Sequence, residues 1–155
     1  MFTQDVAGKA AEAITTYTSI FPDSKTDMIS EYARGEGDKE GYIKHGRFTL
    51  AGQSFIAIDS SGPHQFKFNE SISLVVNCDT QEEIDFYWEK LSAVPQAEQC
   101  GWLKDKFGVS WQIVPTIMNE MMTSGNQNKI NSVTQAFLKM KKFDIKTLEE
   151  AYNKG

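Results

Sequence analysis

Apolar residues recur along this chain with two spacings, one typical of helices and one typical of strands. The spacing of three and four residues predicts a helix over residues 10–21, with Ala10, Ala13, Ile14, Tyr17 and Phe21 on one face. The same spacing predicts a second helix after Thr80, with Ile84, Tyr87, Trp88 and Leu91 on its apolar face. Thr80 and Glu83 form a capping box there, which fixes where the second helix begins.

Runs rich in β-branched and aromatic residues, bounded by turn residues, predict the strands. They fall at residues 26–32, 42–50, 54–59 and 71–77. Residues 35–41 hold three glycines among charged side chains and predict a loop. The stretch Cys100–Pro115 predicts a hairpin: a short strand over Cys100–Leu103, a polar turn that ends at Gly108, and a strand over Val109–Val114.

The second strand of this hairpin separates two kinds of side chain. Val109, Trp111 and Ile113 share one apolar face, which we expect to pack on a helix. Ser110, Gln112 and Val114 share the other face, and their mixed character suits the wall of a cavity. The Gln112 amide then has two interpretations: it binds a ligand in the cavity, or it holds a neighbouring backbone group.

The chain after Thr116 is predicted to be helical. One short helix is expected at residues 117–122, a second with a capping box at Ser132 and Gln135, and a last one capped by Asp144. Apolar side chains form a stripe along this tail: Val133, Phe137, Met140, Phe143 and Leu148. Such a stripe forms either core or a subunit interface, and we expect a homodimer.

Composition excludes several classes of function. The 155 residues carry a net charge of −5, which argues against a nucleic-acid partner because such proteins present a basic face. No apolar run approaches the roughly 20 residues of a membrane span, and no signal peptide opens the chain. The two cysteines, Cys78 and Cys100, have no motif spacing, which favours a reduced, cytoplasmic protein.

The chain repeats itself. Glu12, Ile14 and Tyr17 recur as Glu82, Ile84 and Tyr87, and Gly52, Ser54 and Phe55 recur as Gly108, Ser110 and Trp111. His45-Gly46-Arg47 precedes one hairpin turn as Cys100-Gly101-Trp102 precedes the other. The repeated unit is βαβββ. The first copy lacks a clear opening strand, for which Met1-Phe2 is a candidate stub; either the native start lies upstream or that strand is rebuilt by other means.

Two βαβββ units in tandem resemble the vicinal oxygen chelate superfamily, which contains glyoxalase, bleomycin-resistance proteins and extradiol dioxygenases. More closely, the chain resembles the PhnB-like, 3-demethylubiquinone-9 3-methyltransferase-like branch. The stretches that carry this resemblance are AEAITTYTSIFPDS (Ala11–Ser24), IKHGRFTLAGQSFIAIDS (Ile43–Ser60), FNESISLVVNCDTQEEIDFYWEKL (Phe68–Leu91) and CGWLKDKFGVSWQIVP (Cys100–Pro115).

The resemblance implies an α+β fold in which two modules pair curled mixed sheets around a cleft. The modules are expected at residues 1–66 and 67–116, followed by a helical tail at 117–155 that no superfamily motif covers. Together they are expected to form one globular domain.

The resemblance also implies where a metal would bind. Metal-dependent members place His or Glu on the first and last strands of each module, and these positions fall here on Gln112, near Ser71 and on Ile56, with the fourth in the missing strand. An amide, a hydroxyl and an apolar chain do not hold a divalent ion. We therefore expect neither a metal nor another cofactor.

Further side chains are candidates for the cleft. His45 and Cys100 occupy matching places in the repeat, and a histidine near a thiol can create a nucleophile; the alternative is a hydrogen-bonded strand histidine and a small buried cysteine. Trp102 is a candidate wall for a ligand, although the same ring serves a core equally well. The tentative ligand pocket comprises Gln112, Ser110, Ile56, Trp102, Cys100 and His45.

Two classes of function follow. The first is a metal-independent protein that binds a small molecule, as bleomycin-resistance proteins trap their drug. The second is an enzyme of the superfamily: a metal-dependent lyase or dioxygenase, or a methyltransferase. The residues at Gln112, Ser71 and Ile56 favour the first class. The sequence identifies neither the ligand nor a catalytic residue.

Overall fold

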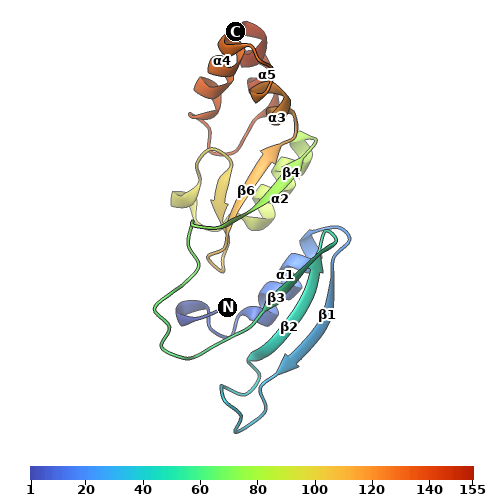
Figure 1. The fold of residues 1–155 in the computed structure, drawn as a ribbon, viewed down its shortest axis with the longest axis vertical. Helices are drawn as coiled ribbons and strands as arrows, with labels where there is room; N and C mark the ends of the chain where they lie inside the picture. The colour runs from blue at the N-terminus through green and yellow to red at the C-terminus, as the bar shows by residue number, and fades with distance from the viewer. The chain divides into compact units, whose positions relative to one another are not determined.

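The protein is an α+β structure built from two compact units. The computed structural model describes residues 1–155, and the chain divides into Met1–Lys67 and Phe68–Gly155. Each unit contains a three-stranded sheet, and Figure 1 shows helices beside both sheets. The predicted α+β class is confirmed, and neither sheet is closed.

The first unit packs one helix on an antiparallel sheet. After a short 3-10 helix, Gln4–Val6, come α1 (Ala10–Ile20), β1 (Lys25–Glu31), β2 (Ile43–Leu50) and β3 (Gln53–Ala57), with the strands in the order β1-β2-β3. The buried face of α1 is the one that the sequence predicts: Ala10, Ala13, Ile14 and Tyr17. Gly46 in β2 admits the helix closely, because a Cβ at this position would lie 2.6 Å from Ile14 Cδ1.

The opening strand of this unit is reduced to a single parallel bridge between Phe2 and Asp59. Asp59 is 3% exposed, and its carboxylate organises the surrounding backbone. Oδ1 accepts hydrogen bonds from the N–H groups of Gly8 (2.8 Å) and Ala10 (3.1 Å), while Oδ2 accepts one from Ile43 (2.9 Å). A carboxylate that receives three backbone donors stabilises the start of α1 and of β2.

The second unit begins with a parallel pair of strands. It contains β4 (Ser73–Cys78), α2 (Gln81–Leu91), a 3-10 helix at Pro95–Ala97, β5 (Trp102–Lys104) and β6 (Ser110–Pro115). The strand order is β4-β6-β5, with β4 and β6 parallel and β5 and β6 antiparallel. The capping box of Thr80 and Glu83 is present. Two strands follow α2, where the repeat predicts three.

Three helices follow the second sheet: α3 (Ile117–Met122), α4 (Gln127–Phe137) and α5 (Ile145–Lys154). Asp144 caps α5 as predicted, accepting a hydrogen bond from the N–H of Thr147 at 2.7 Å. The cap predicted at Ser132 is wrong. The α4 helix begins six residues earlier, because the Asn126 side chain accepts hydrogen bonds from the first free N–H groups.

The apolar stripe of the tail forms part of the core of the second unit. Val133 and Leu148 are fully buried and Phe143 is 3% exposed, whereas Phe137 and Met140 are half-buried. The stripe is therefore core, the first of the two alternatives open at the sequence level. None of the helices combines the length and hydrophobicity that crossing a membrane requires.

The tail also takes the place of the strand that the second unit lacks. The N–H groups of Cys100 and Gly101 donate to the carbonyls of Met140 (2.9 Å) and Lys141 (2.7 Å). In the first unit the matching residues, His45 and Gly46, pair with Ser30 and Ile29 of β1. Residues 140–141 thus bond to the segment of the second unit whose counterpart in the first unit lies beside β1.

Candidate functional site

The candidate site is the face of the β4-β6-β5 sheet that α2 does not cover. Trp111 and Ile113 are 2% and 0% exposed, and the Ser110, Gln112 and Val114 side of β6 forms the opposite face. The register pairs Val75 with Gln112 and Asn77 with Val114, and Trp102 of β5 also pairs with Gln112. The face is mixed: Val75, Val114 and Trp102 are apolar, and amides lie at Gln112 and Asn77.

Gln112 lies in the middle strand of this face. Its Nε2 donates a hydrogen bond to the Ser73 hydroxyl at 2.8 Å, so the amide orientation is set by a side chain of the neighbouring strand. Val75 beside it is 55% exposed, and Trp102 is half-buried. The held amide leaves its Oε1 as a hydrogen-bond acceptor between the apolar side chains of Val75 and Trp102.

Ser110 occupies the same face but is closed to a ligand. It is 2% exposed, and its hydroxyl is buried without a hydrogen-bond partner. At this end of the sheet Lys104, the register partner of Ser110, forms an ion pair with Glu70. The accessible part of the face therefore begins at Gln112 and runs toward Val114.

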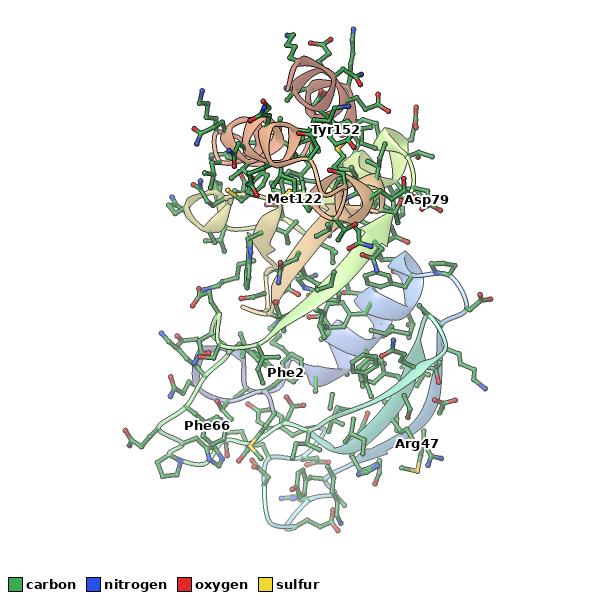
Figure 2. The ribbon with its side chains drawn as sticks, turned by 45° about the horizontal axis from the view of Figure 1, so that its top comes forward. Phe2, Arg47, Phe66, Asp79, Met122 and Tyr152 are labelled. Atoms are coloured by element: carbon green, nitrogen blue, oxygen red, sulfur yellow. The ribbon has the colours of Figure 1, made fainter.

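A groove continues the face at that end. Its volume is about 570 Å³, within the roughly 300–1,000 Å³ range of small-molecule sites. The groove is lined by residues from the ends of β4 and β6 and from α3: Asn77, Val114, Pro115, Thr116, Met118, Asn119 and Met122. Met122 and Asp79, which follows β4, are both labelled in Figure 2. The tail is thus one wall of the groove, a role that sequence periodicity alone does not reveal.

The other predicted site residues lie elsewhere. Ile56 is 62% exposed on β3 of the first unit, where the register places Arg47 of β2 beside it. His45 is half-buried on β2, two residues before Arg47, which is labelled in Figure 2. The structure brings Gln112, Ser110 and Trp102 together on one sheet, while Ile56 and His45 belong to the other sheet.

Cys100 contacts the tail. Its thiol donates to the carbonyl of Phe137 at 3.5 Å, and its backbone has a positive φ of 48°. This contact matches the structural alternative, a small partly buried side chain. The second thiol, Cys78, is fully buried, and desolvation raises its pKa from 9.0 to about 12. A thiol with such a pKa stays protonated at neutral pH and is a poor nucleophile.

Comparison with known proteins identifies the family. The sequence profile of the family described as 3-demethylubiquinone-9 3-methyltransferase matches residues 1–114. The chain belongs to this family. The PhnB-like resemblance predicted from the sequence is therefore confirmed.

One solved structure with the same description supports the assignment. The chain is similar to a Bacillus cereus protein described as a 3-demethylubiquinone-9 3-methyltransferase, PhnB protein, with 42% identity and a TM-score of 0.63 over 71% of this chain and 93% of that one. A Staphylococcus aureus protein is 29% identical over 73% and 92% of the two chains, with a TM-score of 0.31. Protein PA1353 from Pseudomonas aeruginosa shares the fold at 17% identity, with a TM-score of 0.55 over 70% and 90%. No curated protein matches.

In the superfamily that the chain resembles, metal-dependent members carry their ligands at the positions that fall here on Gln112, on Ile56 and near Ser71. The first-strand side chain that bonds to Gln112 is Ser73, and the expected position near Ser71 lies before β4 begins. No three His, Cys, Asp or Glu side chains are grouped so that they could hold a metal ion. The absence of a metal or cofactor stays a prediction, to be tested by elemental analysis.

Two carboxylates that sequence reasoning did not single out as buried centres prove to organise the fold. Asp59 accepts hydrogen bonds from the backbone N–H groups of Ala10 and Ile43, at the starts of α1 and β2. Asp105 is 3% exposed in the hairpin turn; its Oδ2 accepts the Trp111 indole N–H at 2.8 Å, and its Oδ1 accepts the N–H groups of Phe107 and Val109. An Asp two residues before an aromatic residue in a turn that ends in Gly is the available signal.

Proposed function

We propose that this protein binds a small molecule without a metal, using the glyoxalase/bleomycin-resistance fold and the exposed face of the β4-β6-β5 sheet. The observation that carries the proposal is the Gln112 amide, held at 2.8 Å by Ser73 on a face that leads into a groove of about 570 Å³. Small-molecule sites combine apolar walls with a few oriented polar groups, and the lining of this groove contains both kinds of side chain.

The chemistry of the face favours binding over metal catalysis. The ligand positions that the superfamily resemblance assigns carry Gln112 and Ile56, and Ser73 is the hydroxyl partner of the amide. Amides and hydroxyls are weak ligands for divalent zinc, nickel or iron, and an isoleucine is none. Such groups orient a neutral ligand through hydrogen bonds instead.

The family description supplies the second candidate, a methyltransferase, and the superfamily resemblance adds a lyase or dioxygenase. These alternatives are separated from binding by direct measurement. Under the binding proposal, S-adenosylmethionine does not raise the melting temperature, and purified protein contains well under one Zn, Ni, Mn or Fe per chain. A metal near one per chain that is lost on Gln112→Leu favours the enzyme.

The decisive experiment is a thermal-shift screen of a compound library against wild type and Gln112→Leu. The matched control is Gln135→Leu, the same chemical change on the exposed side of α4. Compounds that stabilise wild type and Gln135→Leu but not Gln112→Leu support the proposal. A library in which every stabilising compound acts equally on Gln112→Leu contradicts it.

We further propose that the protein is a cytoplasmic homodimer. With the tail stripe buried, this proposal rests on two exposed apolar side chains of β1 and β3 on one face of the sheet: Met28 and Ile56, which are 40% and 62% exposed and both pair in register with Arg47. Grouped exposed apolar side chains commonly mark interfaces. Sedimentation equilibrium is expected to show a dimer at micromolar concentration that Ile56→Asp weakens. A monomer at that concentration contradicts the proposal.

A further inference from the structure

One wall of the groove between the second sheet and α3 lies outside the residues that match the family. Asn77 and Val114 come from β4 and β6, within the residues that match the family, whereas Met118, Asn119 and Met122 come from α3. The family match ends at residue 114. The tail therefore adds a wall of its own to a surface that the family sheet begins.

Two amides in this groove are available for a ligand. The side chains of Asn77 and Asn119 are exposed and make no hydrogen bond within the protein. The third polar group is already used, because the Thr116 hydroxyl donates to Asp79 Oδ1 at 2.8 Å. Each free amide offers both an N–H donor and a carbonyl acceptor.

Met118 and Met122 supply the apolar part. They are four residues apart on α3, so they lie on the same side of the helix, and both are half-buried. Methionine side chains are flexible and polarizable, and they pack favourably against aromatic rings. Val114 of β6 is half-buried and adds a further apolar side chain to the lining, whereas Pro115 is fully buried. A flat aromatic ring can pack on the two methionine side chains.

The charge around the groove disfavours anions. None of the lining residues is charged. The Asp79 carboxylate lies beside the groove, because it accepts the hydrogen bond of the Thr116 hydroxyl. The net charge of the whole chain is −5. A negatively charged ligand would lose its hydration and meet a carboxylate at the rim.

We propose that this groove binds an uncharged aromatic compound with a hydrogen-bond donor and acceptor side by side, such as an aryl carboxamide. The ring lies against Met118 and Met122, and the carboxamide edge bonds to Asn77 and Asn119. This inference rests on the proposed function, since it names the ligand class for the open end of the same sheet face.

The experiment uses benzamide and benzoate, two probes that differ in charge but share a ring. The protein is labelled with ¹³C at its methionine methyl groups, and each probe is titrated while the methyl signals are recorded. Benzamide is expected to move the signals of Met118 and Met122 saturably, and benzoate to bind at least about tenfold more weakly. Met121, which is 4% exposed, and Met140 serve as internal controls whose signals stay in place.

Variants test the amides. Asn77→Leu and Asn119→Leu are each expected to weaken benzamide binding at least about fivefold, which corresponds to roughly 1 kcal/mol for a lost hydrogen bond. Asn128→Leu, an exposed position on α4, is the matched control and leaves binding unchanged. Both groove positions are exposed, so these variants are expected to fold, which the unmoved Met121 signal verifies.

The outcomes separate this inference from the function on which it rests. Equal binding of benzamide and benzoate, or benzamide shifts that survive both Asn variants, overturns the ligand class. Library compounds that need Gln112 but leave Met118 and Met122 unmoved overturn the groove assignment while the proposed function stands. A library without any stabilising compound, together with unmoved methyl groups, overturns both.

Discussion

The Gln112 amide donates to the Ser73 hydroxyl across 2.8 Å, joining the middle strand of the second sheet to its parallel neighbour. Both side chains are half-buried on the face that α2 leaves uncovered. The partner is a side chain, where the structural interpretation from the sequence expected a backbone group. The amide is held through its nitrogen and keeps its oxygen as an acceptor, and ligand binding by this oxygen stays a prediction.

The hydrogen bond between Gln112 and Ser73 predicts a modest coupling between the two residues in the free energy of unfolding. Gln112→Leu and Ser73→Ala are each expected to cost about 0.5–1.5 kcal/mol of unfolding free energy, with a coupling of similar size in the double variant. Urea unfolding of the two single variants and the double variant measures it. Additive effects within about 0.3 kcal/mol would show that the bond contributes nothing in solution.

The opposite face of β6 predicts a larger effect. Trp111 is 2% exposed, and its indole N–H donates to the Asp105 carboxylate at 2.8 Å. Trp111→Phe keeps an aromatic ring but removes that donor, and a hydrogen bond to a charged group contributes about 1.5–3 kcal/mol. We expect a loss of at least that size in chemical unfolding. Trp102→Phe, at a half-buried ring, is the control and is expected to cost less than about 1 kcal/mol.

Most of the structural features that were predicted correctly are encoded by local sequence patterns. The buried faces of α1 and α2, the Thr80 capping box and the apolar side of β6 all follow from spacing and from groups close in sequence. The capping box predicted at Ser132 and Gln135 does not start a helix, although it fits the pattern as well as Thr80 and Glu83 do. Asn126 caps the helix earlier in the chain with its own side-chain oxygen, so Val133 is a buried residue inside α4.

Features that depend on residues far apart in the sequence were not predicted. Residues 140–141 bond to Cys100 and Gly101, a pairing across some forty residues that no periodicity encodes. The groove has the same origin, because Asn77 and Met122 meet only when α3 packs beside the sheet. Of the predicted pocket, Gln112 and Trp102 lie beside each other as register partners, while Ser110 is covered.

The buried thiol predicts a pH-dependent stability. Desolvation raises the pKa of Cys78 to about 12 from 9.0, so above pH 9 the unfolded chain releases this proton first and the folded state loses stability as pH rises. Cys78→Ala is expected to lose less stability between pH 8 and pH 10 than wild type loses. Urea unfolding across that range measures the difference. A parallel decline in both proteins would contradict the assignment.

The same burial predicts selective labelling. In the native protein, a disulfide reagent such as dithionitrobenzoate is expected to label Cys100, which is half-buried, and to reach Cys78 only on unfolding. Cys100→Ser should therefore show no fast-reacting thiol in the native state. Cys78→Ser should keep the one that wild type has, which identifies the labelled residue without mass spectrometry.

The docking of the tail on β5 gives the last prediction, which compares two glycines. Gly101 and Gly125 have φ values of +80° and +75°, so an alanine at either position adopts a strained backbone. Their surroundings differ: a Cβ at Gly101 would overlap the Phe143 ring and lie 2.9 Å from the Ile113 carbonyl oxygen, whereas at Gly125 nothing lies within 4 Å. Gly125→Ala thus measures the backbone strain alone.

We expect Gly125→Ala to cost about 1–2 kcal/mol and Gly101→Ala to cost a further 1–3 kcal/mol or so, because the tail must shift away from β5. Phe143→Ala removes the ring that meets the new methyl group. It should therefore cost clearly less in the Gly101→Ala background than its usual 3–5 kcal/mol for a buried phenylalanine. If the two substitutions instead add, the ring does not occupy the space over Gly101, and the tail does not replace the missing strand in the way that its hydrogen bonds to Cys100 and Gly101 indicate.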